Sequence, residues 1–555
     1  MKSFNFTFLL FFLMIFAARV KAQENPREKG LEAITKEAVQ GQLEFLASDW
    51  TQGRETGKQG ELIAADFIAS IFKIYGLLPA GDVEETEISH REETEGKKPE
   101  KFQTYFQKIN FVEYSDGGNN EFSLSSGANT YNFNHKTDFQ LRTSDIGLEI
   151  NAPVVFTGYG YVNKEKGYDD FKGVDVKNKI ILCLSGYPGY NDTTSNAYIA
   201  FTEKDEEGPG PRRMTDDKEK YAKEKGALAI IEVDPEWDPT RNWEANVPFH
   251  YNTRMYEGDQ PLRSMYSSRM KIPGDTLSDD LTTIYISPRV LNELTNGTDI
   301  NITRFAEEVK NNLKPASKEI PGKKVHIKTS VNSRIVQAQN VIGRIPGKDT
   351  NNFVVIGAHY DHLGTYDGYI WNGADDNASG TVGMMTIAKA FMASGVKPDK
   401  TILFCAWTGE ERGLLGSRYF VDHLPVPPER VSMYLNYDMI SRDDSDDTLG
   451  IQIRFMYTEG YNSFEDNTRK FNEENNFGLD ITFRSSARPR GGSDHTHFAR
   501  KGIPIIYYMA GFPTQYHQAD DHVELVNWDK MVKIIKLGYL NVWDAVYGEV
   551  RKEEK

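Results

Sequence analysis

Cysteine is almost absent from this chain. Only Cys183 and Cys405 occur among the 555 residues, and they lie within the apolar stretches IILCLS and TILFCAW. A cysteine inside a strand-like apolar stretch is most often a small buried hydrophobic residue. We therefore expect neither a disulfide nor a thiolate metal site.

An excess of basic residues is also absent. The chain has 65 basic and 81 acidic residues, which gives a net charge of −16. Nucleic acids and anionic membranes attract proteins through basic side chains that displace counterions. The composition therefore argues against nucleic acid or an anionic membrane surface as a partner.

Long apolar runs are absent after the first 22 residues. Those residues contain Lys2, then the run FNFTFLLFFLMIFAA, and then Val20-Lys21-Ala22 at the end. A basic start, an apolar centre and small terminal residues are typical of a secretory signal peptide, and a membrane-spanning anchor needs a longer run. We expect export to the periplasm or the extracellular space, with no stable membrane association after cleavage.

The length of the chain and the change in its pattern of strands and helices predict several domains. A chain of 555 residues is too long for one hydrophobic core. From about residue 330, apolar strands alternate with helical segments, which is typical of a mostly parallel sheet covered by helices on both faces. We predict an α/β fold with three parts, namely a signal peptide at 1–22, a discontinuous main domain at 23–111 and 326–555, and an inserted β-rich α/β domain at 112–325.

Ionisable residues follow four of the predicted strands. In open parallel sheets, ligands bind beyond the carboxyl ends of the strands, so these residues should meet at one edge. Singly, an aspartate there is more often a turn former or helix cap, but the coincidence at four strand ends favours a site. The segments and their following residues are FVVIGA with His359 and Asp361, TILFCAW with Glu410 and Glu411, MYLNY with Asp438, and IPIIYYM with Tyr516 and His517.

The residue types at these strand ends favour a metal centre. Two histidines and several carboxylates without thiolate suit zinc, manganese or cobalt better than copper or iron–sulfur clusters. More carboxylates converge than one zinc needs, so a carboxylate-bridged pair of ions about 3.5–4 Å apart uses them best. Such a pair suits the hydrolysis of an amide bond.

Six motifs, in their order along the chain, resemble the co-catalytic zinc aminopeptidases of peptidase family M28. They are HYDHLG, GADDNASG, TGEERGLLGS, NYDMI, GGSDHTHF and YHQADD, and the similarity covers roughly residues 30 to 110 and 330 to 545. Between these regions, VVFTGYGY, YDDFKGVDVKNKIILCLS and KEKGALAIIEV resemble the protease-associated (PA) domain. The resemblance implies a zinc-peptidase/phosphorylase-like fold with an inserted PA domain, and an enzyme that removes N-terminal residues from peptides.

The resemblance also implies a set of metal ligands. In the family, the bridging aspartate stands three residues before the serine of an SG pair, which is Ser379 here, so the bridge is Asp376. The adjacent Asp375 then shapes the turn or tunes the site. The implied ligands of two zinc ions are His359 and Asp438 at one ion, Glu411 and His517 at the other, and Asp376 between them.

Further roles follow from the same positions. Glu410 corresponds to the general base that takes a proton from a metal-bridging water. Tyr516 corresponds to a donor to the developing oxyanion, and Asp361 to the residue that orients His359. His362 stands next to Asp361 in HYDHLG, but the family does not use its position as a ligand.

Several alternatives stay open. Carboxypeptidases or dipeptidases of the glutamate-carboxypeptidase type share the PA insert but hold the substrate carboxylate with clustered arginines, with which Arg484, Arg488 and Arg490 do not align convincingly. Glutaminyl cyclases use one zinc and lack the insert. Transferrin-receptor-like relatives are binding scaffolds without the metal ligands, whereas all five ligands and the base are intact here. The run SRDDSDDTLG is either a calcium site or a hydrated acidic turn.

Overall fold

A computed structural model provides the coordinates of the chain. The predicted signal peptide and Arg490 lie outside the residues that it describes. Side chains of residues 211–216 are likewise not described. The described residues are 25–87, 98–142, 144–202, 211–235, 268–366, 368–489 and 491–553.

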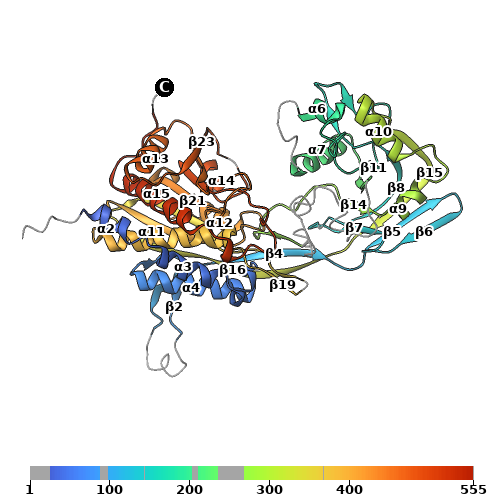
Figure 1. The fold of residues 1–555 in the computed structure, drawn as a ribbon. Helices are drawn as coiled ribbons and strands as arrows, with labels where there is room; N and C mark the ends of the chain where they lie inside the picture. Colours follow the sequence, from blue (N-terminus) through green and yellow to red (C-terminus); the bar gives the residue numbers. More distant parts are fainter. Residues whose placement is uncertain are drawn as a thin grey trace, which may run out of the picture. The chain divides into compact units, whose positions relative to one another are not determined.

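The chain divides into two compact units (Figure 1). The first unit consists of Met1–Ile109 and Gln337–Lys555, and the inserted unit is Asn110–Val336. Strands β4 (Phe106–Asp116) and β16 (Val331–Ile345) carry the chain from one unit into the other. Within the described ranges, no helix is long and apolar enough to cross a membrane.

A mixed sheet forms the centre of the first unit, with the strand order β16-β20-β17-β21-β24-β22-β23. Its four central strands are parallel to one another, whereas β16 pairs antiparallel with β20 and β22 pairs antiparallel with β24. The predicted α/β fold with a mostly parallel mixed sheet is confirmed. The strands are β20 (Lys400–Trp407), β17 (Asp349–His359), β21 (Val431–Tyr437), β24 (Ile505–Met509), β22 (Gln452–Thr458) and β23 (Asp480–Ser486).

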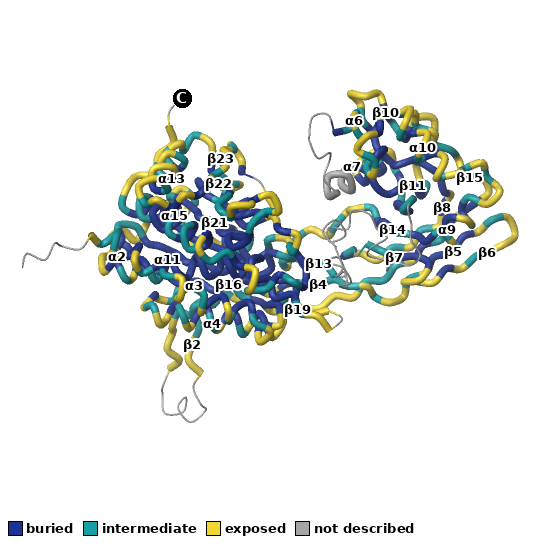
Figure 2. Tube along the Cα trace, in the orientation of Figure 1, coloured by how far each residue is buried: buried dark blue, intermediate teal, exposed yellow. Residues whose placement is uncertain are grey.

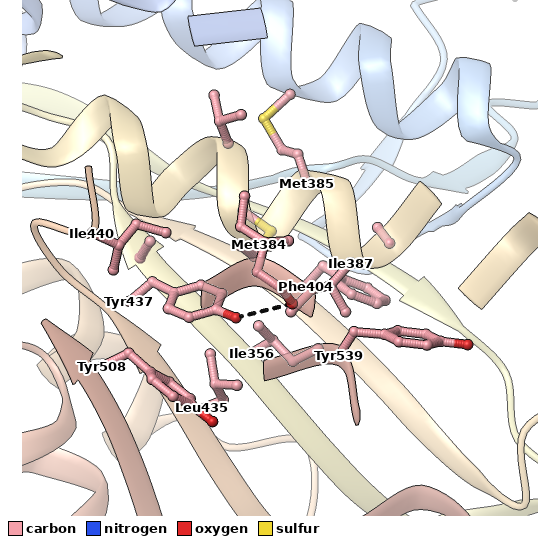
Figure 3. Close-up of a cluster of buried hydrophobic side chains, with 14 of the residues drawn as sticks. Ile356, Met384, Met385, Ile387, Phe404, Leu435, Tyr437, Ile440, Tyr508 and Tyr539 are labelled. Carbon is pink, nitrogen blue, oxygen red and sulfur yellow. Dashed lines mark hydrogen bonds between the residues drawn. The ribbon is translucent and has the colours of Figure 1, made fainter. Parts of the chain in front are cut away.

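Both faces of this sheet are buried, as Figure 2 shows for the first unit. Ile356, Phe404 and Leu435 face a core that includes residues of α11 and α15. In Figure 3, Met384 of α11 reaches toward these strands, and Met385 points away from them toward the N-terminal helices. On the other face, Trp407 and Cys405 pack with residues of α12 and α14. Strands buried on both faces explain the continuous apolar runs in the sequence.

The helices of the first unit begin and end at clear signals. In α4, the apolar spacing ends at Gly76, whose φ of 85° closes the helix in the left-handed conformation. Both cysteines are buried and free, as expected. The helices are α2 (Pro26–Glu32), α3 (Lys36–Leu46), α4 (Gln59–Tyr75), α11 (Gly380–Ser394), α12 (Leu415–Asp422), α13 (Ser463–Glu474), α14 (His495–Arg500) and α15 (Trp528–Tyr547).

The inserted unit has its own sheet and its own core. The strand order is β6-β5-β15-β8-β11-β12-β14-β7, and β8, β11, β12 and β14 are mutually parallel neighbours. Helices α9 (Pro288–Thr295) and α10 (Ile302–Asn312) contribute Val290, Leu294 and Phe305 to the core. The strands are β5 (Glu121–Ser126), β6 (Asn129–Phe133), β7 (Phe139–Leu141), β8 (Glu149–Phe156), β11 (Ile180–Leu184), β12 (Ala229–Val233), β14 (Thr283–Ile286) and β15 (Lys318–Lys328).

Candidate metal centre

The carboxyl ends of the four parallel strands bring the predicted site residues together. His359 is the last residue of β17, and Asp438 directly follows β21. Glu410 and Glu411 lie in the loop after β20, and His517 lies in the loop after β24. Because β20, β17, β21 and β24 are adjacent, these loops meet at one edge of the sheet.

One group of side chains gathers around His359. Its Nε2 lies 3.4 Å from Asp438 Oδ1, 3.4 Å from Asp376 Oδ1 and 4.0 Å from Glu410 Oε2. The imidazole is only 1% exposed. This group therefore directs one nitrogen and three carboxylates at a common point out of bulk solvent.

A second group gathers around Glu411. His517 Nε2 lies 3.0 Å from Asp376 Oδ2 and 3.3 Å from Glu411 Oε2. His362 Nδ1 lies 2.9 Å from Glu411 Oε1 and 3.8 Å from Asp376 Oδ2. The two oxygens of Asp376 therefore face different groups, Oδ1 toward His359 and Oδ2 toward His517 and His362.

These distances suit two divalent metal ions. Ligand atoms around a tetrahedral zinc ion, with bonds of about 2.0–2.1 Å, lie about 3.3 Å from one another. The principal separations in the two groups are 3.4 Å around His359 and 3.0 to 3.3 Å around His517. Buried carboxylates at this density also need positive charge beside them. The residues present fit a pair of zinc ions.

The loop NGADDNASGT directs its two aspartates to different partners. Asp375 Oδ1 accepts hydrogen bonds from the N–H and the hydroxyl of Ser441, both at 2.8 Å. Gly373 has a φ of 56°, and a Cβ there would lie 2.1 Å from the carbonyl oxygen of Asp376 and 2.5 Å from His362 Cδ2. The small residues of the loop therefore allow the backbone to approach the site closely.

Comparison with known proteins identifies the region that carries this site. Residues 340–539 match peptidase family M28. The chain contains an M28 peptidase domain. All five predicted ligands and Glu410 lie within the matched residues of this domain.

Sequence relatives of the M28 domain match part of the chain. Leupeptin-inactivating enzyme 1 of Streptomyces exfoliatus is 31% identical over 175 residues, which are 31% of this chain and 36% of the relative. Leucine aminopeptidase 2 of Trichophyton equinum is 43% identical over 102 residues, which are 18% of this chain and 19% of the relative. The chain thus covers about a third and about a fifth of the length of these two relatives.

Solved structures share the fold over nearly the whole chain. The aminopeptidase from Aneurinibacillus sp. strain AM-1 has a TM-score of 0.56 and 18% identity, covering 95% of this chain and 98% of that one. BSAP, a zinc aminopeptidase from Bacillus subtilis, has a TM-score of 0.52 and 20% identity, covering 94% of this chain and 98% of that one. At these identities the likeness establishes the fold.

Asp361 supports the M28 site through the backbone. Its Oδ1 accepts a hydrogen bond from the N–H of Glu410 at 3.1 Å, and its Oδ2 accepts one from the N–H of Glu411 at 3.3 Å. His359 Nδ1 lies 3.2 Å from the backbone oxygen of Asp361 and 3.9 Å from Oδ1. The orienting of His359 by the Asp361 carboxylate stays a prediction. This carboxylate accepts its hydrogen bonds from the backbone of the two glutamates and from the hydroxyl of Thr56 at 2.8 Å.

The two adjacent glutamates have opposite pKa shifts. Burial raises the pKa of Glu410 well above its usual range against the opposing effect of His359, and the charges of Glu411 and Asp438 add to the rise. Burial also acts on Glu411, but His517 and the hydrogen bond with His362 outweigh it and hold the pKa of Glu411 well below its usual range. Glu411 is therefore suited to remain an anionic ligand, and Glu410 to accept a proton.

Arg54 is a site residue that the sequence motifs did not reveal. It lies outside the residues matched by the M28 family, and its side chain is 0% exposed. Its guanidinium donates to the backbone oxygens of Tyr360 at 2.7 Å, Asn372 at 2.6 Å and Gly373 at 2.9 Å. Arg54 thereby ties the carboxyl end of β17, which carries His359, to the loop that carries Asp376.

Tyr516 lies beside the second group of ligands. It is half-buried, and its ring stacks on that of His517, with centroids 3.9 Å apart.

The acidic run SRDDSDDTLG contacts a lysine. Lys530 Nζ lies 2.5 Å from Asp443 Oδ1 and 3.1 Å from Asp447 Oδ2. The ammonium of Lys530 thus supplies positive charge within this run, and the choice between a calcium site and a hydrated acidic turn stays a prediction.

Proposed function

We propose that the protein is an exported di-zinc aminopeptidase that hydrolyses N-terminal residues from peptides. The observation that carries this proposal is the position of Asp376, whose two oxygens face two separate groups of histidine and carboxylate ligands. His359 and Asp438 would hold one zinc ion, Glu411 and His517 the other, and Asp376 would bridge them. When bound, the zinc ions would polarise the scissile carbonyl and make a water acidic near neutral pH.

The protein side chains would supply proton transfer and positioning. Glu410 would accept the proton of the attacking water at its carboxylate and donate it to the leaving amine. Tyr516, whose ring stacks on His517, would donate a hydrogen bond to the oxygen on which negative charge develops. Asp361 would fix the backbone of Glu410 and Glu411 through its two hydrogen bonds.

The domain boundaries, the PA identity of the inserted unit and export also belong to this proposal. The predicted boundaries at 112 and 325 lie near the compact inserted unit, Asn110–Val336. The apolar segment at 1–22 would direct export. The two compact units and the segment's composition support these assignments.

Peptides with one blocked end provide the test. Aminopeptidase action predicts cleavage of a peptide with a free amine, no cleavage after N-acetylation and full cleavage after C-terminal amidation. A leucyl peptide is a suitable first substrate because several relatives are named leucine aminopeptidase 2. Loss of activity with a chelator and about two zinc ions per chain are expected as well.

The alternative functions give different results in the same assay. A carboxypeptidase would cleave the N-acetylated peptide and fail on the amidated one. A binding scaffold would cleave neither and hold no zinc. Undiminished cleavage of N-acetylated peptide would therefore overturn the aminopeptidase assignment.

A further inference from the structure

His362 lies within ligand distance of the second group. Its Nδ1 is 2.9 Å from Glu411 Oε1 and 3.8 Å from Asp376 Oδ2. Among the described residues, these three side chains form one of two clusters whose donor atoms all lie within 4.8 Å of one another. The ring centroid is 5.9 Å from that of His517. His362 thus shares both carboxylate neighbours of His517.

We propose that His362 is a third imidazole ligand of the metal centre, coordinating through Nδ1 on the side of Glu411 and His517. The proposal rests on the two-metal function proposed above. It adds a residue to the five ligands that the family resemblance implies.

The ring of His362 is held in this orientation from behind. Its backbone N–H donates to the carbonyl oxygen of Arg54 at 3.1 Å, and the residue is 1% exposed. The ring packs against Gly373 so closely that a Cβ there would lie 2.5 Å from Cδ2. The imidazole therefore has little room to turn Nδ1 away from Glu411 and Asp376.

His362 would add a fourth protein ligand to the second group. Ligand atoms around zinc lie about 3.3 Å apart, and Asp376, Glu411 and His517 supply three of them. A catalytic zinc also keeps a position for water and can expand to five ligands, so the attacking water would retain its place. The separations of His362 Nδ1 from the two carboxylates, 2.9 and 3.8 Å, lie on either side of this value. The second group would then hold zinc with two imidazoles and two carboxylates.

This arrangement makes the two metal positions unequal. The position at His359 has one imidazole, whereas the position at His517 would have two. Imidazole is a favoured ligand of zinc, and a fourth protein ligand adds to the affinity. The position at His517 and His362 should therefore bind zinc first and release it last.

Zinc affinity in a His362→Gln variant provides the first test. Equilibrium dialysis against zinc buffers should show two ions per chain in the unchanged protein and a loss of more than about 100-fold in the affinity of the tighter ion in the variant. Removal of a residue that only orients a ligand typically costs about 10–100-fold. His497→Gln, which removes another buried histidine, should leave both affinities unchanged.

Cobalt substitution gives a second test that does not depend on the variant folding. Each cobalt-bound imidazole contributes one strongly shifted N–H proton resonance. The unchanged protein loaded with Co²⁺ should show three such resonances, from His359, His362 and His517, and buried Nε2 of His362 should protect its proton from exchange.

The outcomes separate this proposal from the function on which it rests. Three resonances support His362 as a ligand, whereas two resonances overturn it, even if zinc affinity falls in the variant. An unchanged affinity in His362→Gln also overturns it. Failure of the unchanged protein to bind zinc or cobalt would overturn the two-metal function itself.

Discussion

Asp375 and Asp376 are adjacent in the chain, yet their carboxylates contact different parts of the site. Asp376 Oδ2 lies 3.0 Å from His517 Nε2, whereas Asp375 Oδ1 accepts two hydrogen bonds from Ser441. Asp521 joins the two residues from behind by accepting the backbone N–H of each at 3.1 Å. Asp376 faces the ligand groups, and Asp375 fastens the loop to the segment after β21.

The first prediction separates these two aspartates. Asp376→Ala should abolish the binding of a zinc pair, because both ligand groups lose a shared carboxylate. Burial and the neighbouring Asp521 raise the pKa of Asp375 to about 8, so this carboxyl is largely protonated at neutral pH and an amide resembles it. Asp375→Asn should therefore keep about two zinc ions per chain, measured by elemental analysis. The reverse result would place the bridge one residue earlier.

The second prediction concerns Glu410 and Glu411. Glu410→Gln should keep both zinc ions but lower kcat by about 10²–10⁴-fold, the typical contribution of a general base. Glu411→Gln should instead lose zinc, because this residue contacts His517 and His362 in the second group. Peptidase assays with parallel zinc analysis check both variants. Activity that survives in Glu410→Gln would show that another group accepts the proton.

The gathering of site residues at the strand ends could be predicted from the sequence, because it depends only on the order and direction of the strands. Once strands and helices alternate, parallel neighbours deliver His359 and Asp438 to one edge of the sheet. The contacts of Arg54 could not be predicted in this way. Three of its acceptors are backbone oxygens that stand 306 to 319 residues away along the chain, and such groups leave no pattern in the sequence.

The directions in which individual side chains point could not be predicted from the sequence either. The orientation of His362 depends on the turn after β17 and on the absence of a side chain at Gly373. Likewise, Lys530 enters the acidic run from α15, and its contact with Asp447 spans 83 residues. Motif spacing records which residues are present, whereas these contacts depend on how distant elements pack.

The third prediction tests Arg54 as a support of the two loops. Arg54→Met should lower the free energy of unfolding by about 3–5 kcal/mol, because it leaves buried carbonyl oxygens without their donors. Arg54→Lys should recover part of this loss, since an ammonium has three donors. Urea unfolding of the first unit measures both. Arg454→Met, which removes a guanidinium that is 47% exposed, should cost at most about 1 kcal/mol.

The fourth prediction concerns acid stability and His495. This histidine is 0% exposed and stacks on Tyr507 at 4.6 Å, and neither ring nitrogen has a hydrogen-bond partner among the described residues. Burial, with a smaller effect of His497, lowers the pKa of His495 to about 3. The unfolded chain binds a proton near pH 6.5, whereas the folded protein does not. Stability is therefore fully present above pH 6.5 and falls as the pH drops toward 3, by up to about 5 kcal/mol.

Replacing His495 with phenylalanine should remove this acid sensitivity. His495→Phe keeps the stacked ring and has no site to protonate, so its free energy of unfolding should decline less between pH 6.5 and 4 than that of the unchanged protein. The comparison uses zinc-free protein, so that acid release of metal affects neither sample. His423 also stacks on a tyrosine, Tyr419 at 4.2 Å, but it is exposed, and His423→Phe controls for the replacement of a stacked imidazole by a phenyl ring. If the free energy of unfolding falls equally with pH in His495→Phe and in the unchanged protein, the prediction is wrong, because protonation of the buried ring would then not destabilise the fold.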